Sequence, residues 1–171
     1  MPASLFKKIA EKYFQMKKTV FVIAAFFIAV LSFAQPNVGD KAKEITLPDV
    51  KGKNISLSSL KGKVVLIDFW ASWCGPCRKK VPEIKKTYAK YQPKGFEIYG
   101  ISLDDDAASW KQAIKEDHVN WLHVIDAKGD VAGLWNVNYI PNTFLLDKTG
   151  KIIAINPSYE ELNALLKKLL G

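Results

Sequence analysis

The feature that most constrains this chain is a pair of cysteines, Cys74 and Cys77, which lies between an apolar segment and a charged one. Residues 64–70 are mostly apolar and rich in β-branched side chains, which predicts a buried strand. Residues 75–91 are rich in Lys and contain Glu and Pro, which predicts a helix. The two cysteines are therefore expected where a strand passes into a helix.

A strand-to-helix junction gives a cysteine a specific chemistry. The first turn of a helix carries unpaired backbone N–H groups and a partial positive charge, so Cys74 is expected to be partly thiolate. The C-x-x-C spacing brings both sulfurs to one face of the helix, close enough to bridge. Pro76 fits there, because a first-turn N–H has no partner in any case. In the working cycle Cys74 attacks a substrate disulfide, and Cys77 then resolves the mixed disulfide.

Two other uses of a C-x-x-C pair compete with this interpretation, a zinc site and a purely structural disulfide. Zinc takes about four ligands, and the chain has no further cysteine and only His118 and His123, which lack ligand spacing with the pair. A disulfide that closes so short a loop restricts the unfolded chain very little. Both alternatives are disfavoured, so no metal and no cofactor is expected besides the redox-active disulfide Cys74–Cys77.

The cysteine segment resembles the active site of thioredoxin, because residues 68–71 (D-F-W-A) precede residues 73–77 (W-C-G-P-C). Its surroundings, residues 60–63 (L-K-G-K) and 82–83 (P-E), are more similar to the exported TlpA and ResA type of thiol-disulfide oxidoreductase. Residues 137–147 resemble the segment that carries the cis-proline of that family. The similarity extends from about residue 36 to the end of the chain.

The pattern of elements predicts an α/β fold in which helices cover both faces of a mixed sheet. The resemblance implies a thioredoxin fold: a three-layer α/β/α sandwich with a mixed central sheet, an N-terminal β-hairpin leader and an extra strand-helix insertion before the cis-proline. Ser158 and Glu161 form a capping box that predicts the start of the last helix. The expected strands are 45–47, 55–57, 64–70, 96–103, 122–126, 143–146 and 152–155, and the other expected helices are 75–91, 107–117 and 129–135.

Asp68 is the first of several residues expected to tune the site. It interrupts an apolar strand, where burial should raise the pKa of its carboxyl group. The resemblance to thioredoxin implies that Asp68 lies behind the cysteines and takes the proton of Cys77 when the mixed disulfide is resolved. The competing interpretation is an acid that is hydrogen-bonded to backbone or water at a strand end. Thioredoxin also has a lysine near this acid, and Gly100 stands at that position here, so the partner of Asp68 is absent or comes from elsewhere.

The resemblance also assigns roles around the cysteines. It implies a cis peptide bond before Pro141, which would face the cysteines, keep metals off the thiols and leave the Ile140 backbone free to pair with an extended substrate. Trp73 would belong to the docking surface beside Cys74. With Gly75 and Pro76, these positions make up the expected substrate-binding residues.

One position departs from the related proteins. ResA-type reductases often have a glutamate three residues after the second cysteine, and Lys80 stands there in this chain. Glu83 is six residues after Cys77 and is not assumed to replace that glutamate. A redox mechanism that depends on it is therefore not expected to carry over.

The first 34 residues differ from the rest. Lys17 and Lys18 precede an uncharged run, and Ser32-Phe33-Ala34 has the small residues of a signal-peptidase site. We interpret Met16 as the true start, residues 1–34 as an N-terminal extension with a signal peptide cleaved after Ala34, and residues 35–171 as one thioredoxin-like domain. The alternative is an uncleaved membrane tether, but residues 20–31 are shorter than the roughly 20 apolar residues that span a bilayer.

The charge of the chain argues against nucleic acid as a partner. Its net charge is +8, from 25 basic and 17 acidic side chains; five of the basic and one of the acidic residues precede Gln35, which leaves about +4 for the exported part. So modest a charge is not that of a nucleic-acid-binding domain. Export to an oxidising periplasm also fits a disulfide-handling protein.

These observations predict an envelope thiol-disulfide oxidoreductase that reduces protein disulfides. Its expected partners are envelope protein thiols and disulfides and a membrane electron donor, with roles such as redox homeostasis, antioxidant defence or cytochrome c maturation, and nothing in the sequence requires more than a monomer. A disulfide-forming oxidase or isomerase and a non-catalytic binding module remain alternatives. A peroxiredoxin-like peroxidase is disfavoured, because the Pro-x-x-x-Thr/Ser-x-x-Cys frame of peroxiredoxins is missing.

Overall fold

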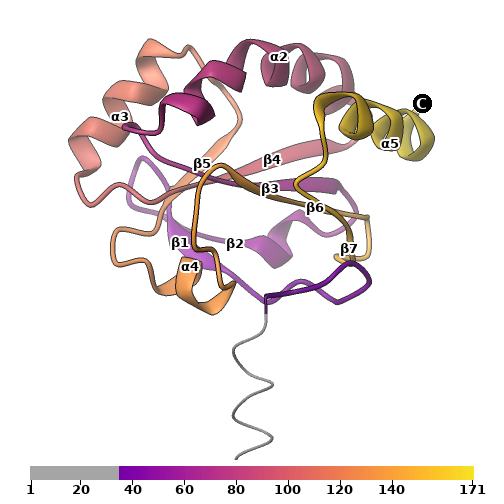
Figure 1. Cartoon of the computed structure of the whole chain (residues 1–171), viewed down its shortest axis with the longest axis horizontal. Coiled ribbons are helices and arrows are strands. Elements are labelled where there is room, and N and C mark those ends of the chain that lie inside the picture. Colours follow the sequence, from indigo (N-terminus) through magenta and orange to yellow (C-terminus); the bar gives the residue numbers. More distant parts are fainter. Residues whose placement is uncertain (1–34) are drawn as a thin grey trace, which may run out of the picture. The chain divides into compact units, whose positions relative to one another are not determined.

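The computed structural model describes residues 35–171, and the expectations for Met16, the signal peptide and cleavage after Ala34 lie outside the described residues. The described part contains a five-stranded sheet in the order β5-β4-β3-β6-β7 and a separate two-stranded hairpin, β1-β2 (Figure 1). The strands are β1 Thr46–Pro48, β2 Asn54–Ser56, β3 Val64–Trp70, β4 Phe96–Ser102, β5 Leu122–Ile125, β6 Asn142–Leu146 and β7 Ile152–Ile155. The helices are η1 Leu57–Leu60, α2 Gly75–Tyr91, η2 Gln92–Lys94, α3 Ala107–Glu116, α4 Asp130–Leu134 and α5 Tyr159–Leu170.

The sheet is mixed, as expected. Strand β3 is parallel to β4 and antiparallel to β6. Strand β4 is parallel to β5, and β6 is antiparallel to β7. The two parallel pairs are joined through α2 and α3, because parallel neighbours need a crossover connection. The strand-helix unit β5-α4 precedes Pro141, so the predicted insertion is present.

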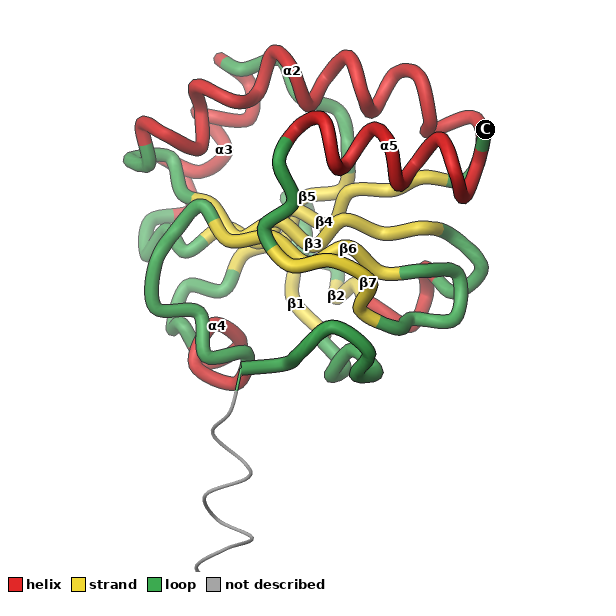
Figure 2. The backbone as a smooth tube through the Cα atoms, turned by 45° about the vertical axis from the view of Figure 1, so that its right-hand side comes forward, coloured by secondary structure: helices red, strands yellow, loops and turns green. Residues whose placement is uncertain are grey.

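Two hydrophobic cores cover the two faces of the sheet. Side chains alternate along β3, so Val65, Ile67 and Phe69 belong to the core beneath the hairpin and α4, whereas Val64 and Leu66 belong to the core beneath α2 and α5. Both views place α2, α3 and α5 on one side of the sheet and the hairpin and α4 on the other (Figure 1 and Figure 2). This is the predicted three-layer arrangement.

Local signals account for most element boundaries. At the start of α5 the Glu161 N–H donates to Ser158 Oγ (3.2 Å) and the Ser158 N–H donates to Glu161 Oε2 (2.8 Å), which confirms the capping box. Leu57 is a correction: it was expected in a strand, but it begins the 3-10 helix η1. The Ser59 hydroxyl donates to the Ser56 carbonyl (2.6 Å), so this turn replaces further strand pairing.

Among residues 35–171, no helix is both long enough and apolar enough to cross a membrane.

Candidate active site

The cysteines lie at the predicted junction, directly after β3 and at the start of α2. Cys74 is the N-cap of α2, and its sulfur accepts the Cys77 backbone N–H at 3.2 Å. Pro76 occupies the first turn, where it costs no helical hydrogen bond. The two sulfurs are joined in a disulfide, and both residues are buried. The disulfide therefore lies at the N-terminus of α2, where a backbone N–H group donates to the Cys74 sulfur.

A buried carboxylate holds the loop that leads into the cysteines. Asp104 Oδ2 accepts the Ser72 backbone N–H (2.9 Å) and the Ser102 hydroxyl (2.6 Å), and Oδ1 accepts the Ser72 hydroxyl (2.5 Å). Asp104 lies in the loop before α3, and Asp106 is the residue that caps this helix. The register of β3 and β4 places Ser102 beside Trp70, and only this pairing shows that Asp104 supports the cysteine loop.

Helix α3 closes one side of the site. Its Trp110 and Ala113 are buried in the same cluster as both cysteines. The Arg78 guanidinium pairs with Asp117 Oδ1 (2.8 Å) and Glu116 Oε2 (2.9 Å), which ties the first turn of α2 to the end of α3. The helix that carries the cysteines is thus held at its cysteine end by both apolar and charged contacts.

Asp68 lies on the α2 side of β3 and lines the same cavity of about 370 Å³ as Cys77, Pro141 and Lys80. Burial raises the pKa of Asp68 to about 6, and the positive charge of Lys80 partly opposes this rise. The direction agrees with the sequence-based expectation. The partner missing at Gly100 is thus supplied by helix α2, at the position where related reductases often carry a glutamate.

The peptide bond between Ile140 and Pro141 is cis, as the resemblance implied. Pro141 lines the cavity below Cys77, and Ile140 packs against the cluster that contains both cysteines. Trp73 is 66% exposed, and Tyr139 is 64% exposed. Tyr139 was not among the predicted site residues, although its place directly before Ile140 is a signal. The other four tryptophans are buried: Trp70, Trp110, Trp121 and Trp135.

Gly75 and Pro76 are exposed at the first turn of α2, next to Trp73. Every residue predicted for catalysis or substrate binding therefore belongs to one of three neighbouring structures: the start of α2, the strand β3 beneath it, or the segment before β6. Their roles in binding stay predictions. Within residues 35–171, no group of three or more His, Cys, Asp or Glu side chains is placed to hold a metal ion.

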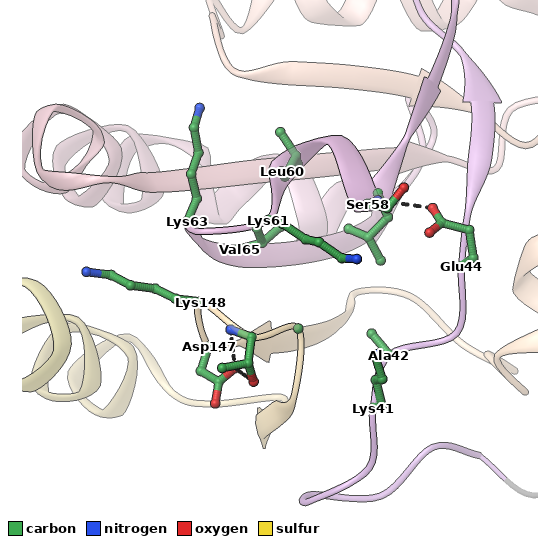
Figure 3. Close-up of a pocket in the computed structure, with 13 residues that line it drawn as sticks. Lys41, Ala42, Glu44, Ser58, Leu60, Lys61, Lys63, Val65, Asp147 and Lys148 are labelled. Carbon is green, nitrogen blue, oxygen red and sulfur yellow. Dashed lines mark hydrogen bonds between the residues drawn. The ribbon is translucent and has the colours of Figure 1, made fainter.

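A second cavity, of about 220 Å³, has no cysteine in its lining, and Figure 3 shows the residues around it. It is lined by Val65 at the start of β3 and by the turn between β6 and β7. Four lysines contribute to it, Lys41, Lys61, Lys63 and Lys148, against the two acids Glu44 and Asp147. None of the predicted site residues lines this cavity.

Comparison with known proteins agrees with the geometry. A model of the AhpC/TSA family matches residues 38–155, which include both cysteines, Asp68 and Pro141. The thiol-disulfide oxidoreductase ResA of Bacillus anthracis is 33% identical over 135 residues, which cover 77% of this chain and 78% of the relative.

Solved structures show the same fold. The thioredoxin domain of a thiol-disulfide oxidoreductase from Bacteroides vulgatus is 37% identical with a TM-score of 0.75, over 80% of this chain and 100% of that chain. A thiol:disulfide interchange protein from Bacteroides sp. is 39% identical with a TM-score of 0.72, over 81% of this chain and 91% of that one. The thioredoxin fold expected from the sequence is thereby confirmed.

The raised pKa of Asp68 has a consequence for stability. Its folded pKa of about 6 exceeds the ordinary value of 3.8, so the native state favours the protonated carboxyl and loses stability as the pH rises from about 4 to about 6. Replacement Asp68→Asn should therefore increase the free energy of unfolding at pH 8, by on the order of 2 kcal/mol. At pH 4 the two proteins should differ little. Denaturant unfolding at both pH values measures this.

The matched control is Asp105→Asn, which removes an exposed carboxylate from the loop after β4. It should give no comparable gain at pH 8. If Asp68→Asn stabilises the protein equally at pH 4 and pH 8, the effect does not come from the ionised carboxylate, and the assigned cause is wrong.

Proposed function

Since the chain belongs to the AhpC/TSA family and, within it, to the TlpA/ResA type of thiol-disulfide oxidoreductase, we propose that it works as a reductase of protein disulfides in the cell envelope. The observation that carries this proposal is the shared cavity of Cys77 and Asp68, because a carboxyl group with a raised pKa can accept the proton of the second thiol. Protein thiols and disulfides are the substrates of this class of enzyme.

The proposed cycle uses the two cysteines in turn. The Cys74 thiolate attacks a substrate disulfide, forms a mixed disulfide and releases the first substrate thiolate. Cys77 then gives its proton to Asp68 and attacks the Cys74 sulfur, so that the Cys74–Cys77 bond forms as the bond to the substrate breaks. The substrate gains two electrons and the enzyme becomes oxidised. A membrane electron donor would return the protein to its dithiol form.

The helix N-terminus supports Cys74 as the attacking sulfur. The Cys74 sulfur already accepts the Cys77 N–H, and such a donor stabilises a thiolate more than a thiol. The exposed Trp73 supports a role as docking surface for the substrate beside Cys74. Gly75-Pro76 and Ile140 match the pattern of reducing thioredoxins, which favours reduction over oxidation.

The substrate and location are part of the same proposal. Candidate substrates are apocytochrome c or other envelope proteins with oxidised cysteines, served by a monomer in the periplasm. Tethering to the membrane by an uncleaved N-terminal segment is the alternative. The modest charge outside residues 1–34 gives no reason to expect nucleic acid among the partners.

The reduction potential of the Cys74/Cys77 pair tests the direction of electron flow. Equilibration of the purified protein with dithiothreitol or glutathione buffers should give about −250 mV or lower. A potential of about −120 mV would identify a disulfide-forming oxidant and overturn the reductase.

Trapping separates an enzyme from a passive binding module. The variant Cys77→Ala cannot resolve a mixed disulfide, so it should accumulate substrates covalently bound to Cys74 that are released by dithiothreitol. The matched control Cys74→Ala should accumulate far fewer. Equal, non-covalent retention by both variants would contradict turnover chemistry.

Cleavage after Ala34 tests the proposed location. Protein recovered from the envelope fraction should begin at Gln35 when its N-terminus is sequenced. A mature chain that begins at Met16 or Met1 and stays with the membrane would instead support the tether.

A further inference from the structure

Three residues on neighbouring strands lie side by side across the sheet. Asp68 on β3 pairs with Gly100 on β4, and Gly100 pairs with His123 on β5. Residues paired in this way point to the same face of a sheet. Because the middle residue is glycine, it adds no side chain of its own between Asp68 and His123.

The absent side chain at Gly100 matters sterically. A Cβ atom there would lie 3.1 Å from His123 Nδ1 and 3.3 Å from Trp121 Nε1. Such contacts are tighter than ordinary van der Waals distances, so the imidazole occupies part of the room that a larger residue would need. The absence of a side chain at Gly100 therefore leaves the room that the imidazole of His123 occupies.

A small cavity is lined by both Asp68 and His123. It offers about 20 Å³ of room for the centre of a water molecule, and a single water needs about 10–15 Å³. Asp68, Cys77 and His123 all contribute to its wall. The complete lining is Asp68, Trp70, Cys77, Val81, Asp117, Val119, Trp121 and His123.

Three buried nitrogen atoms around this cavity lack partners in the described residues, whereas the Asp117 carboxylate is paired with Arg78. His123 is 6% exposed, and within the described part of the chain neither ring nitrogen has a hydrogen-bond partner. The indole nitrogen of Trp70, which lines the same cavity, is also unpaired there. Leaving a buried polar group unpaired costs about 1–3 kcal/mol. Polar walls of this kind favour a bound water, which needs two to four hydrogen-bonding groups.

The imidazole is suited to bind water without carrying charge. It stacks on Trp121, with ring centroids 5.6 Å apart, and lies edge-on to Trp70 at 5.7 Å. Burial lowers the pKa of His123 to about 4, so the ring is neutral near pH 7. A neutral imidazole has one nitrogen that donates and one that accepts a hydrogen bond.

We propose that His123 is a positioning residue for proton transfer from Cys77 to Asp68, acting through a water molecule that it holds in the small cavity lined by all three residues. This inference rests on the proposed function, in which Asp68 accepts that proton. The Cys77 thiol proton passes to the carboxylate by way of the water, the Cys77 sulfur attacks Cys74, and the electron pair of the broken bond leaves with the substrate sulfur. His123 stays neutral and donates to or accepts from the water throughout.

Other charged groups line the same two cavities, and of these Lys80 acts on the pKa of Asp68. They lie on α2, directly after α3 and at the start of α5: Lys80, Glu83, Asp117 and Glu160. Because the substitutions below leave all four in place, a change in the titration of Asp68 reports on the water and not on these charges.

The test is the titration of the Asp68 carboxyl carbon by NMR in the disulfide form of the full chain, where the cysteines do not titrate. A water that donates to a carboxylate stabilises its charged form. The variant His123→Phe keeps an aromatic ring between Trp70 and Trp121 but removes both nitrogens. It should raise the Asp68 midpoint by about half a pH unit or more.

Two further variants make the result specific. Gly100→Ala places a methyl group 3.1 Å from His123 Nδ1, which pushes the imidazole out of position, so it should raise the midpoint in the same direction. His123→Asn restores a polar side chain at this place and should bring the midpoint back to within about 0.2 unit of the wild type. The rate at which Cys77 resolves a mixed disulfide on Cys74 should then rise with pH at the same shifted midpoint in His123→Phe and Gly100→Ala.

A purely structural His123 predicts a different pattern. Its replacement would lower the unfolding midpoint of the protein while the titration of Asp68 stayed in place, and that result would overturn the proposal. An unchanged midpoint in Gly100→Ala would overturn it as well. The NMR titration uses no substrate, so a failure of the reductase proposal, seen as an oxidising potential, is distinguishable from a failure of this one.

Discussion

The constraint on which the site depends is the carboxyl group of Asp68 in the middle of an otherwise apolar strand. A carboxylate in this position is expensive to ionise, because burial removes it from water. Its surroundings offset the cost only in part, through the charge of Lys80 on α2. A fold selected for stability alone would place an apolar residue at this position. In the proposed cycle the acid serves Cys77, whose thiol must lose a proton, and the two residues line one cavity.

Much of this arrangement could be predicted from the sequence. Three features follow from residues that are close together in the sequence: the apolar run of β3, the capping box of α5 and the strand-to-helix position of the cysteines. Such local patterns do not depend on which distant segments pack together. The raised pKa of Asp68 followed from one acid in an apolar strand. The cis bond before Pro141 came from resemblance alone, since spacing carries no information on peptide geometry. Leu57 was expected at the end of a strand but begins η1. A turn that is held by a serine hydroxyl and the end of a strand have similar sequences.

What the sequence could not show is the pairing between strands. Asp68, Gly100 and His123 are separated by 32 and 23 positions, and only the register of β3, β4 and β5 makes them neighbours. His123 was therefore considered as a metal ligand and set aside, and Gly100 was seen only as the absence of a lysine. Lys80 was likewise identified as a departure from related reductases, while its action on Asp68 required the position of α2. This part of the site therefore follows from the register between strands and not from the composition of the chain.

The two cavities that touch Asp68 are both lined by Cys77 and not by Cys74. The exposed Trp73 instead stands on the outer side, next to Cys74. The surroundings of the two cysteines therefore differ: the cavities that hold Asp68 reach Cys77, and the exposed indole of Trp73 directly precedes Cys74. In the proposed cycle, a polypeptide docked on Trp73 would leave these cavities free for the proton of Cys77. Such a division would let the proposed reductase accept partners of many shapes with one proton acceptor.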